Sequence, residues 1–171
     1  LLSAWYPATS APAGYYFLRL TVENECGLTS VATNVVYLDR QAPTIDIREP
    51  DDNDIIGGKV QIDGTAWDLC TGDFDLRYRP LGGVALPVTS EFPPWIENDP
   101  LGEWNTRTVV DGNYEILLSA MDGCDNGSSV LRAVTVDNTP PTVAITAPVS
   151  CDYISGTVVI TGTATDAHLA S

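Results

Sequence analysis

Aspartates recur at the ends of predicted strands, and their carboxylates are the groups in this sequence best suited to chemistry. Asp39 and Asp137 each close a predicted strand ahead of a proline-containing hinge, whereas Asp68, Asp122 and Asp166 each follow another strand. Carboxylate and carbonyl oxygens are the preferred ligands of Ca²⁺. The pattern therefore suggests calcium sites where such strand ends meet. The alternative left open is a solvated acidic turn, in which Asp is chosen for bonds to nearby backbone.

The sequence offers few residues for a catalytic site or a histidine-based metal site. His168, which we expect to be a loop residue, is the only histidine. Both serine triads and His-based metal centres depend on histidine. Zinc is not expected, because the sequence also has no C-x-x-C pair. A carboxylate pair for glycoside hydrolysis is compatible with so many acids, but a small repeated sandwich with short loops leaves little room for a pocket. We therefore predict that the chain is not an enzyme.

The overall charge also limits the kinds of partner. The formal net charge is −15, from 8 basic and 23 acidic side chains, which argues against binding nucleic acid through phosphate contacts. No apolar run is long enough to cross a bilayer, so no membrane span is predicted in this segment. The net negative charge is compatible with binding of divalent cations and with an extracellular setting.

A repeat organises the elements that must position the aspartates. Residues 43–68 align without a gap on residues 141–166, an offset of 98 residues (141 − 43). The match also extends backwards, because Tyr16, Cys26 and Asp39 fall on Tyr114, Cys124 and Asp137 at the same offset. A fixed long period is typical of a tandem array. It predicts the end of one unit in residues 1–42, a complete unit in 43–139 and the start of another in 140–171.

Alternating apolar residues predict short strands and no helix. Residues facing one side of their strands, and hence a core, are expected in three runs: Tyr16, Leu18, Leu20 and Val22; Val60, Ile62, Gly64 and Ala66; Phe74, Leu76 and Tyr78. A further strand is expected from Trp104 to Val110, and irregular structure from Gly82 to Pro94. About seven strands in roughly a hundred residues predict an all-β fold, a β-sandwich.

The sandwich topology predicts where the aspartates meet. Loops after the second and sixth strands share one pole, so Asp68 and Asp122 should face the preceding unit, which ends at Asp39. By the same logic Asp137 and Asp166 meet at the next joint, with the acidic turn at residues 51–54 nearby. Proline in each hinge ends strand pairing and stiffens the linker. Such joints could assemble the oxygens that Ca²⁺ needs.

The same topology suggests a disulfide and a corner tyrosine. Cys70 and Cys124 both follow strands that end at one pole, so a bridge between them is reasonable and would indicate an oxidising compartment; four buried thiols are the alternative. No partner is assigned to Cys26 or Cys151. Tyr114 starts the penultimate strand, where sandwiches place a tyrosine whose hydroxyl bonds back to nearby backbone. Tyr16 holds the same place one unit earlier.

Trp67 is a candidate for a binding face. It falls on the outward register of its strand, where an indole could stack on a sugar ring or pack against a neighbouring unit. The alternative is that it covers an edge of the sandwich.

Three runs resemble a known class of module. Residues 101–106 (LGEWNT), 111–114 (DGNY) and 120–122 (A-x-D), with the hinge at 136–142, are similar to bacterial immunoglobulin-like tandem repeats of large exported proteins. The first fragment keeps Trp5 and Gly14-x-Tyr16 but lacks the aspartate of the DG motif. Such modules are reused in adhesins, surface layers, fibres and exported enzymes, so the resemblance specifies fold more than function. It also implies joints rigidified by calcium.

These observations predict a structural spacer of a long secreted or cell-surface protein, in a stalk, a surface layer or an extracellular fibre. Its expected partners are neighbouring repeats and other copies of the chain. The alternatives are a glycan- or protein-binding adhesin module and an accessory domain of an exported enzyme. Unpaired edge strands could support lateral association by strand addition.

Overall fold

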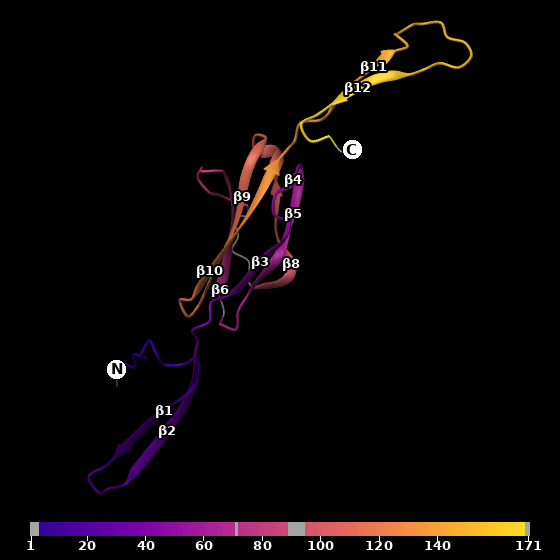
Figure 1. Cartoon of the computed structure of the whole chain (residues 1–171). Coiled ribbons are helices and arrows are strands. Elements are labelled where there is room, and N and C mark those ends of the chain that lie inside the picture. Colours follow the sequence, from indigo (N-terminus) through magenta and orange to yellow (C-terminus); the bar gives the residue numbers. More distant parts are fainter. Residues whose placement is uncertain (1–3, 71, 89–94, 170–171) are drawn as a thin grey trace.

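The chain folds into strands that are strung along one direction (Figure 1). The structure, a computed structural model, describes residues 4–70, 72–88 and 95–169. Its described part is all-β, with one short 3-10 helix at Thr106–Thr108. No helix among the described residues has the length and apolar character needed to cross a membrane.

A central body is built from two sheets. The first sheet has the order β3-β5-β8, formed by Thr44–Glu49, Lys59–Trp67 and Ile96–Asn105. The second has the order β4-β10-β9-β6-β7, formed by Asp54–Ile56, Gly127–Val136, Gly112–Asp122, Gly72–Pro80 and Leu86–Pro87. Neighbours pair antiparallel except β4 and β10, which are parallel.

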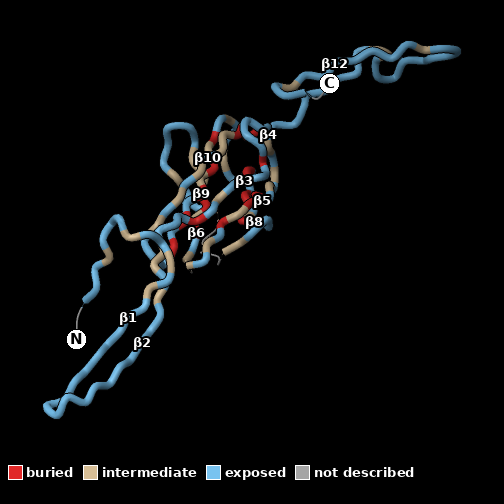
Figure 2. The backbone as a smooth tube through the Cα atoms, turned by 60° about the horizontal axis from the view of Figure 1, so that its bottom comes forward, coloured by how far each residue is buried: buried red, intermediate tan, exposed pale blue. Residues whose placement is uncertain are grey.

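The two sheets of the body face each other across one core. Ile62 and Ala66 of β5 and Phe74 and Leu76 of β6 are buried, as their alternation predicts. The full buried apolar set contains members of both sheets: Ile47, Ile62, Ala66, Phe74, Leu76, Leu101, Trp104, Tyr114, Ile116, Leu118, Ala120, Val134 and Val136. Figure 2 shows the buried residues confined to this body. Packing of this kind is that of a β-sandwich.

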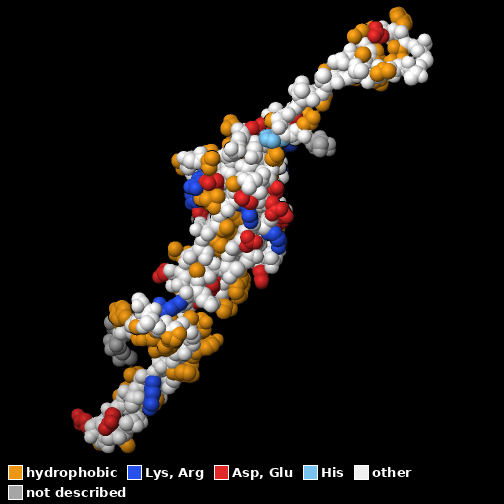
Figure 3. Space-filling model, in the orientation of Figure 1, with side chains coloured by type: hydrophobic (Ala, Val, Ile, Leu, Met, Phe, Trp, Pro, Cys, Tyr) orange, Lys and Arg blue, Asp and Glu red, His pale blue; other side chains and the backbone are white. Residues whose placement is uncertain are grey.

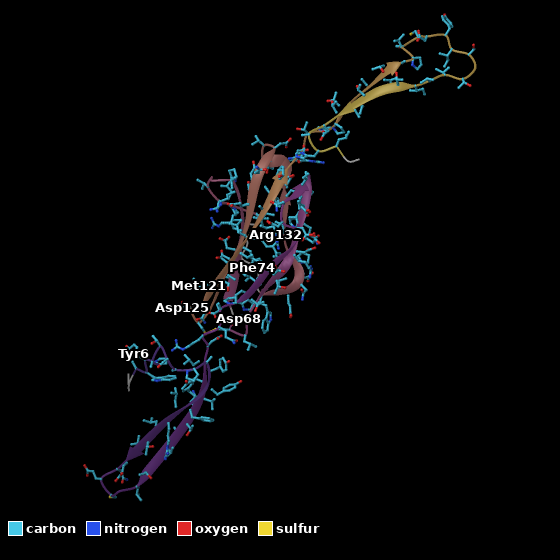
Figure 4. The ribbon with its side chains drawn as sticks, in the orientation of Figure 1. Tyr6, Asp68, Phe74, Met121, Asp125 and Arg132 are labelled. Carbon is cyan, nitrogen blue, oxygen red and sulfur yellow. A yellow bond between two sulfur atoms is a disulfide. The ribbon has the colours of Figure 1, made fainter. Side chains whose placement is uncertain are left out.

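Two paired strands of the sandwich lie so close together that one position must be glycine. A Cβ on Gly64 would overlap the carbonyl oxygen of Asp46 on the paired strand β3, so only glycine fits between these backbones. At the other side of the core, Arg132 of β10 donates a hydrogen bond to the Ile47 carbonyl of β3 and so ties the two sheets together. Arg132 and Phe74 are both labelled in Figure 4.

The prediction of a strand from Trp104 to Val110 is wrong. Trp104 lies near the end of β8 rather than at its start, and the next residues turn into the 3-10 helix. The Asn105 side chain accepts a hydrogen bond from the Arg107 amide, and both the amide and the hydroxyl of Thr106 donate to the Gly58 carbonyl. Side-chain bonds of this kind compete with a sheet ladder. Of the segment expected to be irregular, residues 89–94 lie outside the described residues.

Two-stranded sheets flank the body at each end. β1 and β2 (Gly14–Glu23 and Thr29–Leu38) form one, and β11 and β12 (Thr142–Ala147 and Thr161–Thr165) form the other. The expectation that Leu18, Leu20 and Val22 face a core is not met, since they are 40%, 45% and 56% exposed. No second sheet of the described chain covers this hairpin, although its alternation is that of a strand with one buried face.

Both corner tyrosines are confirmed. The Tyr114 hydroxyl donates to the Val110 carbonyl at 2.9 Å, and the Tyr16 hydroxyl donates to the Pro12 carbonyl at 2.8 Å. Each bond reaches back four residues, across the turn that precedes its strand. The tyrosines therefore have a structural role in fixing these turns.

Candidate functional site

Three aspartates meet where the β1–β2 hairpin joins the body; we call this the first joint. Asp39 follows β2, Asp68 follows β5 and Asp122 ends β9. One carboxylate oxygen from each lies within 4.8 Å of the others. Asp68 is at the end of the body that faces β1 and β2 (Figure 4). The predicted juxtaposition of these three side chains is confirmed.

Part of each carboxylate is used to shape its own turn. An Asp39 oxygen accepts a hydrogen bond from the Gln41 amide at 2.9 Å, and an Asp68 oxygen accepts one from the Cys70 amide at 2.8 Å. These are the local bonds expected of an acidic turn. In the described part of the chain, the second oxygen of Asp39 and that of Asp68 have no hydrogen-bond donor. Among the described residues, Asp39 and Asp68 therefore each keep one oxygen without a donor, which is available to a cation.

Asp122 is held more firmly than the other two. Its side chain accepts hydrogen bonds from the Cys124 amide and from both the amide and the side chain of Asn126, at 2.8 to 2.9 Å. Burial, at 4% exposed, raises the pKa of Asp122, but these hydrogen bonds outweigh burial and leave the pKa below its ordinary value of 3.8. The Asp122 carboxylate is therefore charged at neutral pH.

The first joint thus concentrates negative charge. None of its three carboxylates forms a salt bridge with a described basic side chain. Like charges at such a separation repel one another, and a bound cation would relieve this repulsion. The three carboxylates could supply three of the oxygens that Ca²⁺ requires, with waters supplying the rest.

A disulfide fixes the loop beside the first joint. The structure pairs Cys70 with Cys124, as predicted, with the two Cα atoms 6.6 Å apart. The Trp95 indole also donates a hydrogen bond to the Cys70 carbonyl at 2.9 Å. Sequence reasoning missed this role of Trp95, because no periodicity links it to Cys70. Together the bridge and the indole hold the Asp68 and Asp122 loops side by side.

A groove of about 570 Å³ opens beside the disulfide. It is lined by Tyr15, Tyr37, Asp39, Leu69 and the two bridged cysteines. The two tyrosine rings come from paired strands and meet edge to face with centroids 5.0 Å apart. Figure 3 shows hydrophobic side chains gathered where the hairpin meets the body. The groove therefore combines an apolar wall with the acidic first joint.

The opposite end of the body carries a second group; we call it the second joint. Asp137 follows β10, while Asp166 and His168 follow β12. Their ligand atoms lie within 4.8 Å of one another, so the predicted meeting of Asp137 with Asp166 is confirmed. His168 was expected to be an ordinary loop residue, but its Nδ1 lies 2.6 Å from an oxygen of Asp137. No local pattern could reveal this contact, because the two residues belong to different sheets.

The linker residue Asn138 locks the hinge to the body. Its side-chain oxygen accepts hydrogen bonds from the Gly58 amide and the Thr106 hydroxyl, at 2.9 and 3.0 Å. Its side-chain nitrogen donates to the Thr106 carbonyl at 3.0 Å, and its own amide donates to Asp111 at 2.8 Å. The Thr139 hydroxyl and the Asn138 amide lower the pKa of Asp111 below its ordinary value. The hinge was predicted to be stiff, but this side chain was not singled out.

The other sequence candidates are not members of either metal-like group. The acidic turn at residues 51–54 belongs to no metal-like group of described residues, and its Asp52 accepts a hydrogen bond from the Ala133 amide. Trp67 is 40% exposed, as its outward register predicts. Cys26 and Cys151 are exposed free thiols.

The low pKa of Asp122 predicts an acid-sensitive contribution to stability. Because the folded-state pKa is depressed, the charged carboxylate stabilises the fold above pH 3.8 and loses this effect as the pH falls through the folded-state value. We therefore expect Asp122→Asn to lower the unfolding midpoint at about pH 6, with the difference from wild type shrinking below about pH 3.8. Thermal unfolding from pH 7 to pH 2 measures this. An equal difference at every pH would contradict it.

Comparison with known proteins assigns no family. No protein-family model matches the chain, and no curated protein matches it. Among solved structures, the X-ray structure of the endo-beta-1,4-mannanase from Thermotoga petrophila aligns with a TM-score of 0.43 and 14% identity. The alignment covers 59% of this chain, which spans only 21% of the length of that protein. A likeness at this level supports no conclusion about activity.

Proposed function

We propose that this chain is a structural spacer segment of a long extracellular or cell-surface protein. It is composed of tandem immunoglobulin-like β-sandwich units with a period of 98 residues: the end of one unit in residues 1–42, a complete unit in 43–139 and the start of a third in 140–171. Its partners are the neighbouring repeats and other copies in a stalk, surface layer or fibre. No catalytic role is proposed.

Contacts that recur at the same 98-residue spacing support the repeat. Each of the following bonds has a counterpart one unit later: Gln41 amide to Asp39 and Thr139 amide to Asp137; Cys70 amide to Asp68 and His168 amide to Asp166; Asp51 amide to Asp54 and Val149 amide to Asp152; Tyr16 to Pro12 and Tyr114 to Val110. Backbone conformation follows the same spacing, because Asn53 and Cys151 have φ values of 69° and 70°. Sequence similarity alone would not require equal bonds.

One observation carries the spacer role. At both ends of the body, an aspartate that ends one strand meets an aspartate that begins the loop of the following sheet: Asp39 with Asp68, and Asp137 with Asp166. The joints between units are therefore built from side chains rather than left as free linkers. A built joint keeps successive units in line, which is what a spacer requires. The disulfide adds support for a secreted location, because such bridges persist in oxidising compartments.

We further propose that Ca²⁺ stiffens the first joint through Asp39, Asp68 and Asp122. Binding to the folded form alone raises stability by RT ln(1 + [L]/Kd), about 2.7 kcal/mol at a hundredfold excess over Kd. The expected result is a higher unfolding midpoint in millimolar Ca²⁺ than in chelator, together with a longer and narrower small-angle scattering envelope. Both changes should be lost in Asp68→Asn and retained in Asp99→Asn, an exposed aspartate of β8.

The same experiment separates the two claims. An elongated envelope with no calcium effect would contradict the calcium site. The disulfide and the prolines alone would then stiffen the array. A compact or widely flexible envelope in both conditions would contradict the spacer role itself. The scattering profile is informative here because units in line and units folded back on one another differ in maximum dimension.

A second candidate function is suggested by the exposed indole of Trp67. An adhesin module would use such a ring to stack on a sugar or to contact a cell-surface protein. Titration of the chain with soluble glycans should then quench tryptophan fluorescence, and Trp67→Ala should abolish the quenching. Unchanged fluorescence across the glycans would favour the spacer.

A further inference from the structure

We propose that the second joint is a binding site for a divalent transition-metal ion, with Zn²⁺ the best match, formed by His168, Asp137 and Asp166. This assigns the two ends of the body to different metals: an oxygen-only set at the first joint and a mixed nitrogen and oxygen set at the second. The proposal does not depend on the spacer role, because it concerns only the chemistry of these three side chains.

The distances suit a tetrahedral ion. Zn²⁺ binds histidine nitrogen and carboxylate oxygen at about 2.0–2.2 Å, which places two ligand atoms of a tetrahedral site about 3.3 Å apart. The three ligand atoms at the joint lie within 4.8 Å of one another, and the closest pair, His168 Nδ1 and an Asp137 oxygen, is 2.6 Å apart. The required spacing lies between these two values. Small side-chain rotations would therefore open room for the ion.

The ligands are oriented by bonds to backbone, as metal ligands usually are. The other oxygen of Asp137 accepts a hydrogen bond from the Thr139 amide at 3.0 Å, and an oxygen of Asp166 accepts one from the His168 amide at 2.8 Å. The Asp137 side chain is only 13% exposed and that of His168 is 34% exposed. These contacts fix two ligands of the set before any ion arrives, and they leave the outer oxygens and the imidazole to bind it.

Space for the remaining coordination is present at the same place. A groove of about 360 Å³ runs along the joint and is lined by all three side chains and by Asp111. Asp111 is already bonded to the Asn138 amide and the Thr139 hydroxyl, so it supplies negative charge rather than a ligand. A water molecule in the groove completes a four-coordinate site.

The imidazole decides between metals. Ca²⁺ and Mg²⁺ take oxygen ligands, whereas a nitrogen ligand favours Zn²⁺ and the later first-row ions. The first joint is the internal contrast, because its three ligand atoms are all carboxylate oxygens and the equivalent neighbour there is a bridged cysteine. At the second joint the metal would connect the end of β10 with the loop after β12, and so couple the body to the next sheet.

The single histidine of the chain gives a direct readout. With only one histidine present, its ring proton resonances in an NMR spectrum belong to His168 without assignment. The untagged chain is stripped of metal with chelator and titrated with ZnCl₂ and, separately, with CaCl₂. We expect the ring signals to shift and saturate at one equivalent of Zn²⁺, and to remain in place with one equivalent of Ca²⁺.

Matched variants identify the other ligands. In Asp137→Asn and in Asp166→Asn, calorimetry should show at least a tenfold loss of Zn²⁺ affinity, whereas Asp39→Asn at the first joint should stay within twofold of wild type. Ring signals unmoved by stoichiometric Zn²⁺ would overturn the proposal. So would equal affinity in wild type and in the two ligand variants, since that would mean adventitious binding to a lone imidazole. Retained circular dichroism in each variant shows that a loss is not caused by unfolding.

Discussion

Replacing both Cys70 and Cys124 with serine is expected to lower the free energy of unfolding by about 4 kcal/mol. The bridge closes a loop across a sequence separation of 54 residues, and chain entropy for a loop of that length gives a value of this order. The pair also holds the Asp68 and Asp122 loops together, so the loss should extend to the first joint. Urea denaturation of wild type and of the double variant measures the difference.

The free thiols provide the control for this prediction. Cys26 and Cys151 are exposed and unbridged, so changing both to serine should leave the free energy of unfolding unchanged within about 0.5 kcal/mol. Adding a reductant to wild type should reproduce the effect of the double variant. A midpoint that does not respond to either treatment would show that the bridge adds nothing to stability.

Asn138→Ala is expected to destabilise the body by about 2–3 kcal/mol, although the residue belongs to the hinge. The substitution removes the acceptor of the Gly58 amide and the Thr106 hydroxyl, and also the donor to the Thr106 carbonyl. Thr106 is fully buried, so water cannot easily replace those bonds. The measurement is again urea denaturation, followed by a fluorescence probe of the body.

A second asparagine tests whether the effect is specific. Asn113 is exposed, and with the described residues its side chain makes one hydrogen bond, from the Thr135 hydroxyl at 3.1 Å. Asn113→Ala should therefore cost about 0.5 kcal/mol or less. Equal losses in the two variants would mean that the hinge is not locked to the body through the Asn138 side chain.

These two predictions bear on how a spacer would transmit orientation. At the first joint, the Cys70–Cys124 bridge holds two loops of the body together, and a cation bound by Asp39, Asp68 and Asp122 would join them to the end of the preceding hairpin. At the second, Asn138 fixes the hinge, and the His168–Asp137 contact reaches the sheet that follows. The two ends of the body are therefore joined to the neighbouring sheets by different chemistry. This difference makes it possible to disturb one joint and leave the other as an internal reference.

The sequence by itself determined the class of fold and much of the geometry. Alternation of apolar residues in residues 60–66 and 74–78 specified two core strands, because side chains in a strand point to opposite faces in turn. The position of Tyr114 after a turn specified its bond back along the chain. The order of strands placed Asp68 and Asp122 at one pole with Cys70 and Cys124, so their proximity followed from topology.

Only the tertiary structure decided the features that depend on distant or irregular segments. Trp104 lies near the end of a strand instead of opening one, because the chain turns into a 3-10 helix at Thr106, where the Asn105 side chain caps the turn. The Leu18 face stays exposed because burial needs a second sheet, which strand alternation does not supply. Trp95, Asn138 and His168 make their contacts through loops without periodicity, so no local pattern signals them. Their roles arise from where separate strands end in space, and that is a property of the folded chain.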